Sequence, residues 1–399
     1  MTAPEPRYEP ARALALWGEE EIAAAVEVLR SRSLFRYYGP DLRHRVDAFE
    51  AEFSAMTGVP HTVGVSSGTA ALTAAMVGLG IPEGAEVIVP AVTFIGSVNA
   101  VVQARGIPVF AEVDDSLTLD PERLDELVTE RTWGIMPVHL ANAAADMRPI
   151  TQVARRHGLR VVEDAAQAAG VHYGGRPVGS LGDAGAFSFQ LEKNLTAGEG
   201  GAVTVGDRAV YDRVARFQDQ GGQFTTGRGG DRGTSAEAPF LGANLRMTEL
   251  TGAVLSVQLR RLGPMLERLR SVARHVRRET AGLPVRWRRL PDEAGSGGDL
   301  TVLLASRLEA RQFVAALTAE GIPAHTMYQG QAVYANRAVR EGRTPWGVAW
   351  DRPARCRVSE GLVGRSVSIG LGATMTDGDV DALVAAFRKA YEGLAPAAG

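Results

Sequence analysis

Short apolar runs alternate with segments of helical spacing through the first half of the chain. Between about residue 60 and residue 205, five runs are rich in apolar residues and are mostly continuous. Continuous apolar runs of this length are typical of strands that are covered on both faces. The five predicted strands are residues 86–94, 132–140, 159–165, 184–190 and 201–205.

Helices are predicted between and after these strands. Residues 120–130 read DPERLDELVTE, with Asp120 as the N-cap. Residues 247–262 place apolar side chains at helical spacing, and a final helix spans residues 379–394 with Thr376 as its cap. Strands that alternate with helices predict an α/β fold with a largely parallel sheet.

The pattern changes in the second half of the chain. Residues 221–242 hold seven glycines and form a predicted long loop, and residues 291–299 form another. A strand-like run at residues 301–307 follows. We expect a large domain over residues 15–265 and a smaller α+β domain over residues 270–399.

The charge and composition exclude several classes of partner. With 43 Lys plus Arg against 46 Asp plus Glu, and no basic run, the chain gives no sign of binding nucleic acid or a membrane surface. No apolar run reaches membrane-spanning length, and the first ten residues lack the apolar core of a signal peptide. The single cysteine, Cys356, suits a reducing compartment. We expect a cytoplasmic globular protein without a metal site.

One of the two lysines in the chain occupies an unusual position. Lys389 lies on the C-terminal amphipathic helix, where lysine and arginine are interchangeable. Lys193 lies in FSFQLEKNLTAGEGGAVTV, residues 187–205, among small and apolar residues. Because a partly buried lysine can lose its proton and attack a carbonyl whereas arginine cannot, Lys193 is a candidate Schiff-base lysine. The alternative is a surface charge that was retained by chance.

A helix N-terminus suited to a phosphate is predicted in VSSGTAALTAAMVGLG, residues 65–80. Ser67, Gly68 and Thr69 precede a run of small helix formers, so we expect them to occupy the start of a helix. Free backbone N–H groups and the helix dipole bind a phosphate dianion there. An ordinary serine cap on a tightly packed helix is the alternative.

Two predicted strands end on residues that suit a flat, charged ring. Phe94 ends PAVTF and can stack on a heteroaromatic ring, although an isolated phenylalanine is more often core. Asp164 ends VVED, where a buried carboxylate is costly unless it is paired, and a pyridinium nitrogen is a suitable partner. Gln167 follows within reach of the same ligand. For Asp164 the alternative is a cap of the next helix.

The segment FLGANLRMTEL, residues 240–250, carries Asn244 and Arg246. Arg246 suits bidentate capture of a substrate carboxylate, with a solvated arginine as the alternative. Taken together, the candidates are a phosphate cradle, a ring stacker, a carboxylate for a ring nitrogen and a lysine for an aldehyde. This set describes the cofactor pyridoxal 5'-phosphate (PLP).

The order of the motifs also resembles a known family. GTAAL, PAVTF, EDAAQ, FSFQxxKxxTAGEGG and NxRMTEL follow one another as in the DegT/DnrJ/StrS group of fold-type-I PLP-dependent aminotransferases. The resemblance extends from about residue 30 to the C-terminal helix. It implies a large α/β domain with a mostly parallel seven-stranded sheet between helices, plus a smaller C-terminal α+β domain.

The resemblance also implies roles for single residues. Lys193 forms the Schiff base with the cofactor, and Asp164 pairs with its ring nitrogen. Phe94 stacks on the ring, and Gln167 contacts its hydroxyl side. The residues implied at the phosphate are Ser67, Gly68, Thr69 and Ser188, together with Asn244 reaching over from a neighbouring subunit. The protein is thus expected to be a homodimer with shared active sites.

Two departures from the common family pattern bear on the substrate. The segment MYQGQAVY, residues 327–334, keeps Tyr328 but lacks the histidine that sugar-nucleotide members usually carry after a Tyr-x-Pro-Leu-like segment. The segment VHLANAAADM, residues 138–147, lacks the usual glycine after its His-Leu pair. Both features, with Gln190, resemble the subgroup that acts on cyclitols and 3-amino-5-hydroxybenzoate synthase.

These features predict an aminotransferase of secondary metabolism, including antibiotic biosynthesis. The donor is glutamate or glutamine, and the acceptor is a ketone on a cyclitol or sugar-derived substrate. The candidate substrate-binding residues are Arg246, Tyr328 and His139, although a histidine at a strand end is more often structural.

Two other functions remain open at this point. One is a PLP-dependent dehydratase or aromatising synthase of the 3-amino-5-hydroxybenzoate synthase type. The deoxysugar dehydratases of this group replace the lysine by histidine, so Lys193 argues against that branch. The other is a catalytically idle regulatory protein on the same fold, which the complete cofactor set disfavours.

Overall fold

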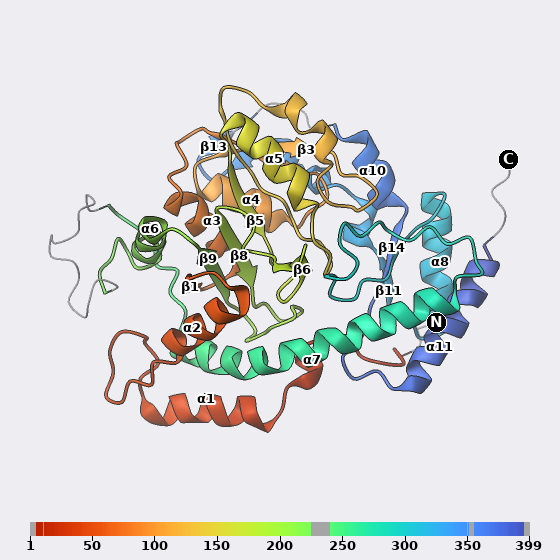
Figure 1. Ribbon diagram of the computed structural model, residues 1–399, viewed down its shortest axis with the longest axis horizontal. Helices are drawn as coiled ribbons and strands as arrows, with labels where there is room; N and C mark the ends of the chain where they lie inside the picture. The colour runs from red at the N-terminus through yellow and green to blue at the C-terminus, as the bar shows by residue number, and fades with distance from the viewer. Residues whose placement is uncertain (1–4, 11, 225–239, 349, 351–354, 395–399) are drawn as a thin grey trace.

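A computed structural model gives the fold (Figure 1). The predicted loop at residues 221–242 falls largely outside the part of the chain that is described. Among the helices that are described, none combines the length and the apolarity needed to cross a membrane. The described residues are 5–10, 12–224, 240–348, 350 and 355–394.

A seven-stranded sheet forms the centre of the molecule. Its strand order is β1-β9-β8-β5-β4-β2-β3. Strand β9 runs antiparallel to β1 and β8, and the remaining neighbours are parallel, which confirms the mostly parallel sheet predicted from the sequence. The strands are β1 (His61–Val65), β2 (Glu86–Pro90), β3 (Ile107–Ala111), β4 (Thr132–Ile135), β5 (Arg160–Asp164), β8 (Ala184–Ser188) and β9 (Gly201–Val205).

Helices cover both faces of this sheet (Figure 1). Successive side chains of a strand point to opposite faces. In β8, Ala186 packs into the cluster on one face, whereas Phe187 packs into the cluster on the other. The helices of the first face are α3 (Gly68–Gly78), α4 (Ile95–Gln103) and α6 (Arg208–Gln218). Those of the second face are α2 (Arg45–Thr57), α5 (Met147–His157) and α7 (Glu249–Glu279).

A second, three-stranded antiparallel sheet lies in the C-terminal part of the chain. Its central strand is β14, and Thr376 caps the last helix as predicted by accepting from the Asp379 N–H. The predicted boundary between residues 265 and 270 lies inside α7, which runs through it. The strands and helices of this part are β10 (Thr301–Leu303), α8 (Arg307–Ala319), β11 (Ala324–Thr326), α10 (Arg357–Gly364), β14 (Ser366–Ile369) and α11 (Asp377–Glu392).

The remaining elements are short or lie at the outer surface. Helix α1 runs along the outer side of α7 (Figure 1). The elements not yet named are the 3-10 turns η1 (Leu14–Leu16), η2 (Pro121–Arg123), η3 (Asp125–Leu127), η4 (Met327–Gly330) and η5 (Val333–Ala335), the helices α1 (Glu19–Ser31) and α9 (Arg337–Arg340), and the strands β6 (His172–Tyr173), β7 (Arg176–Pro177), β12 (Arg343–Thr344) and β13 (Gly347–Val348).

The helix predicted over residues 120–130 is wrong. Asp120 does cap the segment by accepting from the Glu122 N–H, but the chain forms only the two 3-10 turns η2 and η3 there. Thr129 donates its hydroxyl to the buried Glu86 carboxylate, and its N–H donates to Thr132. These contacts turn the chain into β4 before a longer helix can form.

Three predicted strands are shorter than their apolar runs. Strand β2 ends at Pro90 instead of Phe94, β4 at Ile135 instead of Leu140, and β8 at Ser188 instead of Gln190. Apart from the exposed Phe94, the apolar residues beyond these ends stay buried in irregular segments, as Val138 does. These segments leave the sheet at one edge, where the candidate site lies.

Candidate functional site

The candidate site residues gather where parallel strands end. Strands β2, β4, β5 and β8 run parallel to one another, so their carboxyl ends share one edge of the sheet. Ligands of open α/β sheets bind outside this edge. The strand ends or the segments after them carry Phe94, His139, Asp164 and Ser188.

Asp164 is the last residue of β5, and two hydrogen bonds hold its carboxylate. The Ser97 hydroxyl donates to Oδ2 at 2.7 Å, and the Ala166 N–H donates to Oδ1 at 3.1 Å. The residue is 4% exposed. Burial raises the pKa of Asp164, while the two hydrogen bonds and the positive charge of Lys193 oppose this rise. A carboxylate buried in this way calls for a cationic partner.

Lys193 lies in the turn after β8, within electrostatic reach of Asp164. Its backbone N–H donates to Gln190 O at 3.0 Å. Within the described part of the chain, its amine makes no hydrogen bond or ion pair. Burial lowers the pKa of Lys193 and Arg12 lowers it further, against the effect of Asp164. A lowered pKa enlarges the neutral, nucleophilic fraction of the amine.

The start of α3 has the geometry of a phosphate cradle. Ser67 is the N-cap, and its Oγ accepts from the Ala70 N–H at 3.1 Å. In the described structure, the N–H groups of Gly68 and Thr69 have no acceptor, as is usual for a first turn. A Cβ on Gly68 would lie 2.7 Å from Ser188 Cβ, so glycine lets the end of β8 approach the helix start. These orphan donors and the Ser188 hydroxyl fit the phosphate of PLP.

Phe94 exposes its ring beside the same helix start. It is the N-cap of α4 and is 60% exposed. A Cβ on Gly96 would lie 3.0 Å from both Phe94 Cδ1 and Thr69 Oγ1, so the ring edge and this hydroxyl are close neighbours. An exposed aromatic ring next to a phosphate cradle is well placed to stack on the pyridine ring of the cofactor.

The Gln167 side chain is held at both ends of its amide. Its Nε2 donates to the Tyr328 hydroxyl at 2.9 Å, and its Oε1 accepts from the Ala141 N–H at 3.3 Å. Tyr328, Gln329 and Ala141 all have left-handed backbone, with φ of 47°, 57° and 48°. Such conformations cost roughly 1 kcal/mol or more for a non-glycine residue and cluster at functional sites. Tyr328 thus lies at the site, in contact with Gln167.

Arg246 already has an acidic partner, and its substrate role remains a prediction. Its Nη1 lies 2.9 Å from Oδ1 of the fully buried Asp219. Its guanidinium carbon lies 5.3 Å and 5.9 Å from the ring centroids of Phe35 and Phe224. Asp219 also accepts from the Phe224 N–H, so Arg246 is one of several partners of this buried carboxylate. To bind a substrate through Nη1, Arg246 would have to give up this contact, which is costly. Arg246 therefore anchors this aromatic cluster.

His139 lies in the core and does not reach a substrate. It is fully buried, with Nε2 3.0 Å from Glu163 Oε2. Its Nδ1 accepts from the Ala145 N–H at 3.1 Å. With both ring nitrogens engaged and no exposed surface, the histidine has a structural role, which corrects the predicted substrate contact.

Asn244 is exposed and borders the segment that is not described. Its backbone forms an isolated bridge with Asp219. Among the described residues its side chain has no hydrogen-bond partner in the same chain. Its predicted contact with the phosphate of a neighbouring subunit remains a prediction.

Two residues at the site were not predicted from the sequence. Ser97 holds Asp164, and it stands at the end of the quoted run PAVTFIGS, so proximity to Phe94 could have indicated it. Arg12 lies beside Lys193, where its Nη1 donates to Asn194 Oδ1 at 3.2 Å. No local pattern marks Arg12, because it lies 182 positions before Asn194, the residue in the turn that it contacts.

The comparisons with known proteins cover nearly the whole chain. The model of the DegT/DnrJ/EryC1/StrS aminotransferase family matches residues 16–388. The dTDP-3-amino-3,4,6-trideoxy-alpha-D-glucose transaminase of Streptomyces venezuelae is 38% identical to this chain. The match covers 82% of this chain and 84% of that protein. The structure of 3-amino-5-hydroxybenzoic acid synthase has a TM-score of 0.83 and 27% identity, covering 97% of this chain and 99% of that one.

Two further relatives match over a shorter stretch. The GDP-perosamine synthase of Vibrio cholerae is 37% identical over 60% of this chain and 64% of its own length. The L-glutamine:2-deoxy-scyllo-inosose aminotransferase of Streptomyces fradiae is 41% identical over 56% of this chain and 53% of its own length. The chain thus spans less than two thirds of the length of these two relatives.

Proposed function

This chain belongs to the DegT/DnrJ/EryC1/StrS aminotransferase family, which uses PLP, and we propose that it transfers an amino group to a ketone. The family and the fold-type-I class expected from the sequence are confirmed. In the proposal the donor is glutamate or glutamine. The acceptor is a cyclitol or sugar-derived ketone of secondary metabolism.

The observation that carries this proposal is the placement of Asp164 and Lys193 within electrostatic reach of each other at one edge of the sheet. When bound, PLP supplies an aldehyde for the donor nitrogen and a ring that accepts charge from the reacting carbon. Asp164, held by Ser97, keeps the ring nitrogen protonated because its negative charge favours the cationic form. Lys193 takes a proton from the reacting carbon and returns one to the cofactor side.

The remaining residues hold the cofactor in place. The N–H groups of Gly68 and Thr69 and the hydroxyl of Ser188 bind the phosphate at the start of α3. Phe94 covers one face of the ring. Gln167, fixed by Tyr328, meets the hydroxyl side. These contacts would hold the ring in one orientation beside Lys193.

The relatives support the substrate class. Their names include a transaminase of a trideoxyglucose nucleotide, a perosamine synthase and an aminotransferase of an inosose, all of them sugar- or cyclitol-related. The segments around Tyr328 and Asn142 favour the cyclitol side of this range, since they lack the histidine and glycine of common sugar-nucleotide members.

A second candidate is an aromatising synthase on the same site. The structural match to 3-amino-5-hydroxybenzoic acid synthase favours it, at a TM-score of 0.83. The two candidates are distinguished by what they consume and release. An aminotransferase consumes one donor for each amine formed, whereas the synthase consumes no donor and releases water and an aromatic product.

The proposal is tested in two half-reactions. The purified protein is loaded with PLP and mixed with glutamate or glutamine, and its absorbance is followed. We expect the spectrum of the amino form, and return of the starting spectrum when 2-deoxy-scyllo-inosose or a nucleotide-linked keto sugar is added. A protein that binds PLP but keeps its spectrum with both donors contradicts the proposal.

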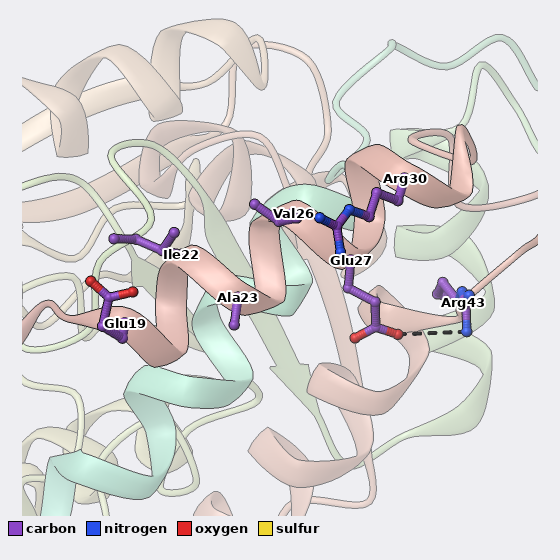
Figure 2. Close-up of a pocket in the computed structure, with 7 residues that line it drawn as sticks. All are labelled: Glu19, Ile22, Ala23, Val26, Glu27, Arg30 and Arg43. Carbon is purple, nitrogen blue, oxygen red and sulfur yellow. Dashed lines mark ion pairs between the residues drawn. The ribbon is translucent and has the colours of Figure 1, made fainter.

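We also propose that the protein is a homodimer with shared sites. Exposed apolar residues gather on and after α1, including Ile22, Leu29 and Tyr38. Figure 2 shows Ile22, Ala23 and Val26 along α1, with Glu19 toward one end and Arg30 and Arg43 toward the other. These residues line a hollow of about 360 Å³. An exposed apolar face of this kind is typical of a surface that a second copy covers.

A mixing experiment tests the shared site. Lys193→Ala removes the reacting amine, and Asn244→Asp places a negative charge where the family resemblance puts a phosphate. In a mixed dimer one site then carries both changes and the other carries neither. We expect two inactive variants to recover activity after subunit exchange. Exchange without recovery would show that Asn244 does not act across an interface.

A further inference from the structure

An amino-acid donor needs a partner for its carboxylate close to Lys193. The α-carboxylate is bonded to the same carbon as the amino group, so it must lie next to the reacting centre. Arg246 is held by the buried Asp219. Arg288 is fully buried, where it donates to Leu140 O and lies 3.5 Å from Asp299. Neither arginine can turn toward a substrate without leaving a buried acceptor.

Arg12 meets this need in position and in hydrogen bonding. Its Nη1 donates to Asn194 Oδ1 at 3.2 Å, on the residue next to Lys193. The side-chain amide of Asn142 lies beside the same nitrogen. When this amide is oriented with its oxygen toward Arg12, the oxygen accepts from Nη1 at 3.1 Å. In the described part of the chain, no carboxylate pairs with this guanidinium at contact distance. Neutral amides do not offset its charge, and Asp299 acts on it through space without a contact.

The segment that carries Arg12 is anchored on both sides. The Tyr8 hydroxyl donates to Gly370 O at 2.9 Å, and the backbone of Glu9 packs against Gly372. Ala13, the next residue after Arg12, is 2% exposed. A guanidinium fixed in this way is preorganised for a ligand, because little side-chain freedom is left to lose on binding.

We propose that Arg12 binds the α-carboxylate of the amino donor, glutamate or glutamine, beside Lys193. This inference rests on the proposed aminotransferase function. The free donors of the guanidinium offer the planar fork that matches a carboxylate. A phosphate of a nucleotide-linked sugar is a poorer occupant, because it is several bonds away from the keto carbon that must face Lys193.

The same placement links donor binding to proton transfer. The charge of Arg12 lowers the pKa of Lys193. A bound carboxylate compensates that charge, so Lys193 becomes a stronger proton acceptor when the donor is in place.

The test compares donors with and without a carboxylate. The PLP-loaded wild type and the variant Arg12→Gln are mixed with L-glutamate, with L-glutamine and with 1-propanamine, and conversion of the cofactor is followed. We expect Arg12→Gln to raise the amino-acid concentration for half-maximal rate by about 10- to 100-fold, the loss of a charge-assisted contact, and to leave 1-propanamine unaffected. Arg12→Lys, which keeps the charge and loses the fork, falls between the two.

Binding without turnover gives a second measurement. Calorimetry with glutarate, which has carboxylates but no amine, should show the same loss of affinity in Arg12→Gln. Arg7→Gln is the matched control, because Arg7 lies on the same segment but donates to Glu320 O at the surface. Arg7→Gln should behave as the wild type. If Arg12→Gln does not fold, Arg12→Lys carries both comparisons.

Three outcomes overturn the inference. Equal slowing of amino acids and 1-propanamine would make Arg12 a structural support of Asn194. A change confined to the acceptor half-reaction would assign Arg12 to the acceptor. Unchanged donor kinetics and glutarate affinity would leave it no role. In each of these the wild type still converts with an amino acid, whereas a wild type that never converts contradicts the proposed function itself.

Discussion

The cofactor side of the site and its substrate side are built from different parts of the chain. On the cofactor side, Asp164 and Ser188 end neighbouring parallel strands and Ser67 caps the helix that follows β1. The hydrogen bonds between neighbouring strands fix the spacing of the residues at the strand ends. On the substrate side, Arg12 lies on the N-terminal segment and Tyr328 on a strained turn before β14. Packing between distant segments positions these two.

This difference indicates which properties of the enzyme can vary. Residues on strand ends keep their geometry as long as the sheet forms, so the cofactor chemistry is tied to the fold. Segments that only pack against the sheet can change without cost to its core. We therefore expect substitutions on the cofactor side to act on rate, and substitutions on the substrate side to act on affinity and substrate choice.

The largest effect is expected for Lys193→Ala. The amine has two tasks, to hold the cofactor aldehyde and to move the proton, so turnover should fall by at least about 10⁴-fold. Lys193→Arg should fall as far, because guanidinium does not lose its proton. Steady-state rates and circular dichroism separate loss of activity from loss of fold. Lys389→Ala is the matched control: this exposed lysine pairs with Glu320 at the surface, and its variant should keep full activity.

Asp164→Asn comes next in size. A neutral amide no longer favours a protonated ring nitrogen, and we expect PLP to bind while turnover falls by about a thousandfold, or about 4 kcal/mol. Ser97→Ala sharpens this result, since it removes one hydrogen bond to the same carboxylate and should cost about tenfold. Wild-type rates in Asp164→Asn would reduce the residue to a support of the turn at Ala166.

The two sides of the site also differ in how far the sequence predicts them. Asp164, Ser67 and Ser188 stand where a strand ends or a helix begins, so apolar patterning and turn chemistry place them at the edge of the sheet. Strands β1 and β3 escaped prediction because their apolar runs are interrupted, in β1 by His61 and Thr62 and in β3 by Pro108. The helix expected at residues 120–130 failed because tertiary contacts of Thr129 override local propensity.

The substrate side could not be predicted because its contacts are long-range. Arg12 is 181 positions from Lys193, and nothing in its own segment distinguishes it from the other arginines. The partners of Arg246 could not be predicted for the same reason: Asp219 and the ring of Phe35 come from other segments of the chain. Charge alone did not show which arginine was already paired.

A smaller effect is expected for Tyr328→Phe on the substrate side. The phenyl ring keeps the left-handed turn and loses only the hydroxyl that accepts from Gln167. We expect kcat/KM to fall about fivefold, the value of one neutral hydrogen bond, and the pH dependence of the cofactor absorbance to shift. Tyr391→Phe is the control, since it also removes one hydroxyl contact, to Pro284 O, but far from the site. A pH profile that moves in both variants or in neither contradicts the contact of Gln167 with the cofactor.

The smallest effect concerns stability without the cofactor. Burial raises the pKa of Asp164, so above that pKa the ionised carboxylate lowers the free energy of unfolding. In cofactor-free protein Asp164→Asn should therefore be more stable than the wild type by about 1 kcal/mol at pH 8. As the pH falls through the raised pKa toward the ordinary value of aspartate, the wild-type carboxyl takes up its proton and the difference should shrink. Thermal unfolding from pH 8 to pH 5 measures this trend.

Asp212→Asn, at a surface ion pair with Arg208, is the control and should show no such gain at pH 8. A cofactor-free Asp164→Asn that is less stable than the wild type at pH 8 would mean that Ser97 and Ala166 compensate the buried charge in full, and that the cofactor side is organised before PLP arrives.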